Sequence, residues 1–305
     1  MARGQASRRK VEIEGREVTL SNLDKVLYPA AGFRKADVID YYRRIAPWVL
    51  PHLAQRPHTL VRAPDGPDGP RFFEKNCPSH HPDWVDTAPG NEATGGTKGC
   101  LVEELPALVW LANLAALELH THQWTLADPA HPTAMVIDLD PGPPATIVDC
   151  CRVALALRET LARLELESVI KTSGGKGLHL SVPILGSGAT DEETKRFALA
   201  LGQLLESRDP DRVLVDMTRS KRPGKVFVDW SQNDRHKTTV CVYSLRLRDR
   251  PTVSTPLAWS EVEAALEAGD EDSLTFEAEA VLARVAEYGD LYADSLTLQQ
   301  YLPAL

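Results

Sequence analysis

The sequence predicts an α/β fold in one composite domain. Segments with apolar residues at helical spacing alternate along the chain with short runs rich in β-branched residues. No long linker, internal repeat or low-complexity tract interrupts this alternation. The 305 residues are 43% hydrophobic and 25% charged, a composition that is typical of a folded globular protein with a sizeable core.

The first half of the chain contains the clearest helical patterns. Residues 35–53 are expected to form a helix, because apolar side chains recur at helical spacing at Val38, Tyr41, Tyr42, Ile45 and Val49. Repeated Asp-Gly and Pro make 63–72 a loop. Residues 104–119 are strongly apolar and predict a buried helix. The apolar run 135–140 predicts a strand, and 143–164 predicts a helix with prolines in its first turn.

The second half mixes strands and helices. Residues 168–184 are two β-rich runs joined by a glycine-rich turn, which predicts a hairpin. A helix is expected over 191–207, with acidic residues in its first turn, where the helix dipole favours them. Strands are predicted over 224–233 and 237–248. The last 45 residues are expected to be helical, acidic and peripheral.

The predicted organisation is a basic flexible tail, a catalytic domain and a short C-terminal tail. The tail covers 1–10, the domain covers 11–295 with an acidic helical part from about 260, and the C-terminal tail covers 296–305. The N-terminus lacks the apolar segment of a secretory signal. No apolar run approaches the roughly 20 residues of a membrane helix. We therefore expect a cytoplasmic protein without a membrane partner, and a monomer is the simplest state.

The net charge of −9 does not exclude a nucleic-acid-binding protein, because the charges are segregated. Residues 1–75 carry 14 Lys and Arg against 9 Asp and Glu, and residues 168–250 carry 15 against 10. Residues 76–167 carry 4 against 13, and residues 261–305 carry 1 against 11. An acidic segment can set the net charge while basic faces elsewhere bind phosphate.

The five cysteines are expected to be buried free thiols. Their number is odd and no CxxC pair is present, which argues against a disulfide framework and against a zinc ribbon. One alternative is a metal site around the segment CPSHH. Its ligands would be Cys77, His80, His81 and Cys100. This spacing matches no standard zinc site.

Asp138 and Asp140 are the first candidate catalytic residues. They are one residue apart in a predicted strand, so their carboxylates share one face while Ile137 and Leu139 face the core. Two buried like charges are costly unless a cation lies between them, and Mg²⁺ or Mn²⁺ prefers carboxylate oxygen. Asp229, in another predicted strand, could complete a two-metal site for phosphoryl transfer. The alternative is that the first two acids cap the following helix.

The segment SGGKGLH, residues 173–179, is the second candidate site. Gly174 and the glycines after it would let backbone N–H groups approach an anion closely. Lys176 adds a positive charge, and His179 can donate a hydrogen bond. The segment is not a Walker A loop, because GxxxxGK[ST] is absent. Alone it would be a plain hairpin turn, but beside an acidic metal site it predicts a triphosphate-binding loop.

Basic and aromatic residues supply the remaining candidates. Arg222 and Lys225 precede the third acid and Arg246 follows it, so all three are candidate phosphate ligands, although a basic run is often only a solvated face. Phe72 and Phe73 directly follow the predicted loop. One or both can stack on a nucleobase, which is worth about 1–3 kcal/mol per base. The alternative is that one packs in the core and the other under the loop.

Three motifs in order resemble one family. DLDPG, SGGKGLH and GKVFVDWSQN are together similar to the polymerase domain of bacterial ligase D, within the archaeo-eukaryotic primase superfamily. The similarity runs from SNLDKVLYP at residue 21 to EYGDL near 287. The resemblance implies a primase-polymerase fold, with mixed or antiparallel central sheets flanked by helices. Without a ligase or nuclease domain, a stand-alone relative or an excised domain is expected.

The resemblance also implies a role for most of the candidate residues. The family's metal-binding triad matches Asp138, Asp140 and Asp229. Positions that hold the incoming nucleotide match His120, Ser173, Lys176, His179 and Arg246. Lysines that bind a 5′-phosphate on the downstream strand of a gap match Lys25 and Lys35. The aromatic pair that packs on the template base matches Phe72 and Phe73. The family pattern does not include Cys77 or Cys100, which supports the expectation of free thiols.

The implied function is that of a nucleotidyltransferase that uses Mn²⁺ or Mg²⁺ at a two-metal site. It would add nucleotides from NTP or dNTP, with a preference for ribonucleotides, to 3′-hydroxyl ends at gaps or breaks in DNA. The implied partners are DNA with a 5′-phosphate, and Ku and a separate DNA ligase by association. The implied location is the bacterial cytoplasm or nucleoid.

Two alternative functions are considered. One is a DxD-type phosphatase with Asp138 as nucleophile and Asp140 as acid and base. It fits poorly, because Pro141 stands where such enzymes need a small hydroxyl residue. The other is a non-catalytic module that holds DNA ends through Lys25, Lys35 and the phenylalanine pair.

Overall fold

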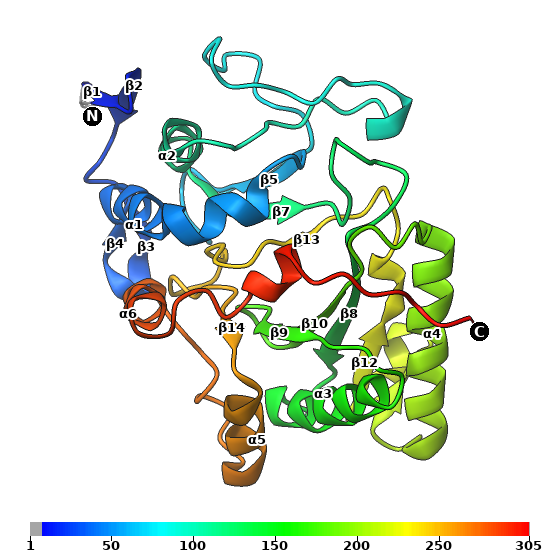
Figure 1. Ribbon diagram of the computed structural model, residues 1–305. Helices are drawn as coiled ribbons and strands as arrows, with labels where there is room; N and C mark the ends of the chain where they lie inside the picture. The colour runs from blue at the N-terminus through cyan, green and yellow to red at the C-terminus, as the bar shows by residue number, and fades with distance from the viewer. Residues whose placement is uncertain (1–7, 305) are drawn as a thin grey trace.

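Two main β-sheets with helices packed against them, and two further two-stranded sheets, β1-β2 and β3-β4, make up the computed structural model, which describes residues 8–304 (Figure 1). The helices are α1 Lys35–Leu53, α2 Leu105–Asn113, α3 Ile147–Ala162, α4 Asp191–Arg208, α5 Trp259–Ala268 and α6 Ala278–Tyr288. The longer strands are β1 Arg8–Ile13, β2 Arg16–Ser21, β5 His58–Arg62, β7 Ala116–Thr121, β8 Ala134–Pro141, β9 Val169–Thr172, β10 Leu178–Pro183 and β12 Val226–Asp229. The shorter strands are β3 Val26–Tyr28, β4 Phe33–Arg34, β6 Phe72–Glu74, β11 Val213–Leu214, β13 Thr239–Val240 and β14 Pro256–Leu257.

The larger sheet has the order β11-β12-β8-β10-β9-β14. All its pairings are antiparallel except β11 with β12, which is parallel, so the sheet is mixed. Ile137 and Leu139 of β8 are fully buried in a core that also contains residues of α3 and α4. Because side chains alternate along a strand, the opposite face of β8 carries Asp138 and Asp140. The predicted in-and-out alternation is therefore present.

The smaller sheet has the order β13-β7-β5-β6 and is antiparallel. Its core lies against α1, α2 and α6 and includes the buried Tyr41 and Tyr42 of α1. The hydroxyl of Tyr42 donates a hydrogen bond to the Leu117 carbonyl of β7 at 2.8 Å. The molecule thus has one hydrophobic core for each sheet, and the mixed α/β architecture agrees with the predicted fold class.

Several sequence predictions are confirmed. The helices over 35–53 and 191–207 are α1 and α4, and the strand over 135–140 lies within β8. The predicted hairpin is β9 and β10, which pair in antiparallel register. The segment from 63 to 71 contains no helix or strand, as the repeated Asp-Gly and Pro predict.

The predicted helix over 104–119 is wrong in its second half. Helix α2 ends at Asn113, and Ala115 adopts a left-handed backbone conformation with φ of 56°. The chain then enters β7, which pairs with β5. No Gly or Pro marks this break in the sequence, and pairing with a distant strand overrides the local helical propensity.

The predicted strand over 237–248 is also wrong in most of its length. Only Thr239 and Val240 form a strand, and Tyr243 has a φ of 63°. The carbonyl of Tyr243 accepts a hydrogen bond from the buried hydroxyl of Tyr41 at 2.7 Å, and the Leu245 amide donates to Tyr42 at 3.1 Å. These tertiary hydrogen bonds hold the segment in a bend.

Two other elements are shorter than predicted. Helix α3 begins at Ile147, after the prolines, and Thr146 caps it together with Asp149. The alternative that Asp138 and Asp140 cap this helix is therefore wrong. Strand β12 ends at Asp229, and a short 3₁₀ helix, Trp230–Gln232, follows within the range predicted as strand.

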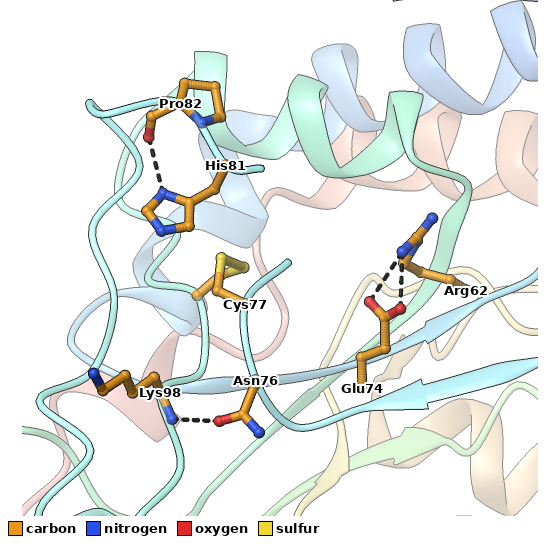
Figure 2. Close-up of a disulfide and its surroundings, with 8 residues drawn as sticks. Arg62, Glu74, Asn76, Cys77, His81, Pro82 and Lys98 are labelled. Carbon is orange, nitrogen blue, oxygen red and sulfur yellow. Dashed lines mark hydrogen bonds and ion pairs between the residues drawn. A yellow bond between two sulfur atoms is a disulfide. The ribbon is translucent and has the colours of Figure 1, made fainter. Parts of the chain in front are cut away.

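The expectation of five free thiols is wrong for two cysteines. Cys77 and Cys100 form a disulfide (Figure 2), whereas Cys150, Cys151 and Cys241 are buried and free. Cys77 follows β6, and Cys100 forms an isolated bridge with His58 at the start of β5. Because β5 and β6 pair, the two cysteines meet although 23 positions separate them. An odd cysteine count does not exclude a single such link.

The two chain ends differ from the predicted tails. Residues 1–7 of the expected basic tail lie outside the described residues, but Arg8–Lys10 belong to β1, which pairs with β2. In the C-terminal segment, the Gln300 amide accepts a hydrogen bond from the Glu167 backbone N–H at 2.6 Å and donates one to the Pro183 carbonyl at 2.9 Å. Over residues 8–304, no helix combines the length and the apolar character needed to cross a membrane.

Candidate active site

A cavity of about 250 Å³ is lined by residues from both sheets. It gathers seven of the predicted site residues, namely His120, Asp138, Asp140, Ser173, Lys176, His179 and Arg246. Strands β8 and β10 of the larger sheet contribute the acids and His179, and β7 of the smaller sheet contributes His120. The residues that the sequence analysis selected from distant motifs are therefore close together in space.

The register of three strands places the acidic residues. Asp138 of β8 lies directly opposite Asp229 of β12 and directly opposite His179 of β10. Residues opposite one another on neighbouring strands share a face and have their Cβ atoms about 5 Å apart. Asp140 is two residues further along β8 and so faces the same side. The three predicted carboxylates thus lie on one face of the larger sheet.

Mutual repulsion is visible in the ionisation of Asp138. Burial, together with the charges of Asp229 and Asp140, raises the pKa of Asp138 to about 7. His179 places Nε2 3.4 Å from the Asp138 carboxylate. Arg222 places a guanidinium nitrogen 3.4 Å from Asp140 while its guanidinium lies 3.8 Å from the centre of the Phe227 ring. An added divalent cation would relieve the repulsion among the three acids.

The donor set fits Mg²⁺ or Mn²⁺ in its chemistry, since all three candidate ligands are carboxylates. The side chains are not drawn together around one point. Among residues 8–304, no group of three His, Cys, Asp or Glu side chains is arranged to hold a metal ion. Asp229 instead accepts hydrogen bonds from the Ser231 amide at 2.9 Å and from Gln232 at 2.9 Å, and so caps the short 3₁₀ helix. Metal binding at Asp229 would require these hydrogen bonds to rearrange.

The glycine-rich turn is shaped by Ser173. The Ser173 hydroxyl accepts hydrogen bonds from the backbone N–H groups of Gly175 and Gly177, each at 3.2 Å. These two N–H groups are therefore engaged within the turn and do not point freely at an anion. A Cβ at Gly177 would collide with the Leu139 carbonyl of β8, so glycine is needed for the close approach of the hairpin. Ser173 and Lys176 are the residues of the turn that line the cavity.

His179 is fixed from behind by a buried lysine. Lys171 of β9 donates hydrogen bonds to the Ser254 hydroxyl at 2.7 Å and to the Val240 carbonyl at 3.1 Å, and its Nζ lies 3.3 Å from His179 Nδ1. Burial lowers the pKa of Lys171 to about 7. Burial and the neighbouring Lys171 charge also hold the pKa of His179 well below its ordinary value. His179 therefore faces the acids as a neutral imidazole.

Glu118 of β7 joins His120 to Arg246. Its carboxylate accepts hydrogen bonds from His120 Nε2 at 2.8 Å and from Arg246 Nε at 3.1 Å. Arg246 also donates to the Ser173 carbonyl in the glycine-rich turn. These contacts bring the smaller sheet, the 241–247 segment and the turn together at one end of the cavity.

A cationic pocket lies beside the N-terminus of α1. The Lys35 backbone N–H donates to the Lys25 carbonyl at 2.8 Å, which brings the two predicted phosphate ligands together. Burial, together with the charges of Lys25 and Arg62, lowers the pKa of Lys35 to about 8. Lys25 pairs with Asp65, and Arg62 pairs with Glu74 at 2.8 Å. The N-terminus of a helix also favours anions, so the pocket suits a phosphate group.

Both predicted stacking residues are exposed. Phe72 and Phe73 of β6 are 46% and 60% exposed, so the alternative that they pack in the core or under the loop is wrong. The Phe73 ring lies 6.3 Å from the His120 ring, centre to centre. Phe72 lies opposite Arg62 in the pairing of β5 with β6. The aromatic pair therefore lies between the cavity and the cationic pocket.

Two of the proposed ligands lie away from the cavity. Lys225 precedes β12 and donates a hydrogen bond to the Pro210 carbonyl. Arg222 contacts Asp140 without lining the cavity. The alternative metal site at Cys77, His80, His81 and Cys100 is wrong, because the two cysteines are joined by a disulfide.

Sequence reasoning missed several residues of the cavity and its walls. They are Glu118, Lys171, Gln232, Thr238, Thr239 and Arg248. Two carried a signal that could have been read. Glu118 is two positions before His120, which places both on one face once the segment is recognised as a strand. Lys171 is a charge inside an apolar strand, which requires a specific partner. The other four residues belong to irregular or very short elements.

Comparison with known proteins decides the family. The family model of the LigD primase-polymerase domain matches residues 34–292. The chain belongs to this family. The non-homologous end joining protein LigD of Mycolicibacterium smegmatis is 42% identical over 280 residues, which cover 90% of this chain and 36% of that protein. LigD of Bacillus subtilis is 30% identical over 250 residues, which cover 82% of this chain and 40% of that protein.

A solved structure agrees with this assignment. The polymerase domain of Mycobacterium tuberculosis ligase D, in complex with DNA, superposes with a TM-score of 0.83 at 40% identity, covering 93% of this chain and 99% of that one. The chain spans less than half the length of the LigD proteins that it matches. It is a nucleotidyltransferase of the LigD primase-polymerase type, a family that uses nucleotide substrates and metal ions. This assignment replaces the phosphatase and the non-catalytic module.

Proposed function

We propose that this primase-polymerase domain adds nucleotides to 3′-hydroxyl ends at gaps or breaks in DNA during end joining, with a preference for ribonucleotides. One observation carries the proposal. A single cavity combines acids on β8 with basic groups from three other segments, and Phe73 of the aromatic pair lies beside His120 in the cavity lining. The preference for ribonucleotides rests on the family resemblance alone.

Each group has a distinct part in the proposed reaction. Asp138 and Asp140, with Asp229, hold the divalent cations, which when bound lower the pKa of the primer hydroxyl and neutralise charge on the leaving pyrophosphate. Lys176, Arg246 and His179 contact the triphosphate. The neutral His179 donates a hydrogen bond without adding charge beside the acids. The arrangement positions the substrate and stabilises charge, which is what phosphoryl transfer requires.

The second set of groups binds the downstream end of the gap. Lys25 and Lys35 bind the 5′-phosphate, and the proposal is supported by the lowered pKa of Lys35, which burial and then the charges of Lys25 and Arg62 cause. Phe72 and Phe73 stack on the template base at that end. Arg222 and Lys225, outside the cavity, are assigned to phosphate groups further along the nucleic acid.

The setting of the reaction follows from the relatives. The matched LigD proteins act in non-homologous end joining, and the solved polymerase domain is bound to DNA. DNA is therefore the proposed partner of this chain. Ku and a DNA ligase are proposed as further partners, and the bacterial cytoplasm or nucleoid as the location. We propose that residues 11–295 act as one catalytic domain and as a monomer.

Extension by one nucleotide on a gapped duplex tests the proposal. The downstream strand is supplied with or without a 5′-phosphate, and Mn²⁺ with rATP or dATP is offered opposite thymine. The proposal predicts extension that depends on the phosphate and that is faster with rATP. Equal extension with and without the 5′-phosphate would contradict the gap-filling role. Faster extension with dATP than with rATP would contradict the preference for ribonucleotides.

A further inference from the structure

The contacts of Glu118 point to a role in ordering the nucleotide site. Its side chain is 9% exposed, and burying a carboxylate is costly unless its oxygens are well paired. Its oxygens accept hydrogen bonds from His120 at 2.8 Å, from Arg246 at 3.1 Å and from the Leu247 backbone N–H at 2.8 Å. Burial opposes ionisation, but the hydrogen bond from His120 and the charge of Arg246 outweigh it and lower the pKa of Glu118 to about 2. Glu118 is thus ionised at neutral pH.

These hydrogen bonds determine which nitrogens remain for a ligand. A carboxylate only accepts, so His120 donates from Nε2 and Arg246 from Nε. One terminal nitrogen of Arg246 also donates to the Ser173 carbonyl. Within the described part of the chain, the Nη2 atom of Arg246 has no hydrogen-bond partner and can donate to a ligand, whereas the likewise unpartnered Nδ1 of His120 donates only when the ring carries a second proton. Both residues line the cavity.

We propose that Glu118 is a positioning residue that sets His120 and Arg246 in the orientation in which they receive the polyphosphate of the incoming nucleotide. The inference rests on the proposed nucleotide site and adds to it a buried residue that need not touch the substrate. Without the carboxylate, the His120 ring loses its hydrogen-bond acceptor and the Arg246 guanidinium is held only by its hydrogen bond to the Ser173 carbonyl. Loss of the Glu118 carboxylate therefore weakens nucleotide binding, whereas the groups that are proposed to bind the DNA end keep their positions.

Two substitutions of Glu118 distinguish its hydrogen bond with His120 from those with Arg246 and Leu247. Glu118→Ala removes both carboxylate oxygens and therefore all three hydrogen bonds. Glu118→Gln keeps an oxygen for Arg246 and Leu247 but turns an amide donor toward His120, which disrupts only that hydrogen bond. With saturating gapped DNA, Glu118→Ala is expected to raise the KM for rATP by roughly 10- to 100-fold. The free energy of one hydrogen bond to a charged group corresponds to a change in affinity of about this size. Glu118→Gln is expected to have a smaller effect, and kcat and the affinity for 5′-phosphorylated gapped DNA change little in both.

The matched control is Glu261→Ala in α5. Glu261 also accepts hydrogen bonds from an arginine, Arg284, at 2.6 and 2.8 Å, and from a backbone N–H, that of Ala258, at 2.8 Å. It does not line the cavity. A purely structural role for Glu118 would make both variants lose melting temperature with no change in KM, and this result would overturn the inference.

A second test uses a protein that lacks both side chains that Glu118 is proposed to orient. In a His120→Ala and Arg246→Ala protein, Glu118→Gln is expected to add less than about 2-fold to the KM, because the groups that it orients are gone. The full increase in that background would show that Glu118 acts by another route and would also overturn the inference. If Glu118→Ala does not fold, Glu118→Gln carries the comparison. Failure of the wild-type protein to extend any primer would count against the proposed function instead.

Discussion

The acids of the larger sheet and the lysines beside the smaller sheet carry opposite charges, and in each set one member has its charged form disfavoured. On the larger sheet, burial and two neighbouring acids raise the pKa of Asp138 to about 7. Beside the smaller sheet, burial and two neighbouring cations lower the pKa of Lys35 to about 8. Each shift shows that the folded protein disfavours the charged form of the group until a ligand of opposite charge arrives.

Because the two regions differ in charge, we infer that they have different functions. The acids on β8 and β12 suit divalent cations and the chemistry of nucleotide transfer. Lys25, Lys35 and the exposed phenylalanines suit a phosphorylated DNA end. His120, 6.3 Å from Phe73 and also part of the cavity lining, lies where the two regions meet. Substitutions of the acids should therefore affect catalysis, and substitutions of Lys25, Lys35 or the phenylalanines should affect recognition of the DNA end.

The largest effect is expected from Asp138→Ala. It removes the acid that lies opposite both Asp229 and His179, so the rate of primer extension should fall by roughly 1000-fold or more, the equivalent of several kcal/mol. Affinity for gapped DNA should be retained. Single-turnover extension and a binding titration measure the two quantities. Asp128→Ala, an exposed acid paired with His131, is the control that should extend normally, and robust extension by Asp138→Ala would break the assignment of the acids.

Lys35→Ala should act on the other region. It should weaken binding of 5′-phosphorylated gapped DNA by roughly 10- to 100-fold, since a charge-assisted hydrogen bond to phosphate is lost. Binding of the 5′-hydroxyl substrate should be unaffected. Because burial of the ammonium is itself unfavourable, the melting temperature should not fall. Lys195→Ala serves as the control lysine, and an equal loss with both substrates would contradict the phosphate assignment.

The two regions also differ in how far the sequence predicted them. The alternation of Asp138 and Asp140 with Ile137 and Leu139 is a local pattern, and it correctly placed the acids on one face and the apolar residues in the core. Asp229 was added because it lies in another predicted strand, 224–233, and the structure places it at the end of β12, opposite Asp138. The sequence pattern predicts the faces correctly because successive side chains of a β-strand point to opposite faces of the sheet.

The smaller sheet depends on contacts between distant segments, and there the sequence was misleading. Ala115 turns the chain out of α2 without any Gly or Pro, so β7 and the carboxylate of Glu118 were hidden inside a predicted helix. The disulfide between Cys77 and Cys100 likewise depends on the pairing of β5 with β6. Such features follow from long-range pairing, which short-range propensity does not encode.

A more moderate effect is expected from Phe73→Ala. Loss of one base-stacking contact costs about 1–3 kcal/mol, so affinity for gapped DNA should fall by roughly 5- to 150-fold. Stability should hardly change, because Phe73 is 60% exposed. Tyr288→Ala, which removes an aromatic ring that is 54% exposed on α6, is the control. Unchanged DNA affinity together with a lower melting temperature would mean that Phe73 is a packing residue.

The smallest effect concerns pH. Lys35 is charged below its pKa of about 8 and loses its charge as the pH rises above it. A 5′-phosphate has its second pKa near 6 and stays fully charged in that range. Preference for the 5′-phosphorylated end should therefore be full near pH 7 and fall less than about 10-fold by pH 9, as measured by the ratio of the two binding constants. Lys35→Arg stays charged and should keep a constant ratio; a parallel decline in that variant would exclude Lys35 as the titrating group.

The central claim is that catalysis and end recognition are separable. Its most direct test measures Asp138→Ala and Lys35→Ala side by side, for both extension rate and affinity, on one gapped duplex with and without a 5′-phosphate. The account predicts that Asp138→Ala keeps its preference for phosphorylated DNA but does not extend. Lys35→Ala should lose the preference but still extend at saturating DNA. If both variants lose both properties while remaining folded, the two regions form one inseparable site and the account is contradicted.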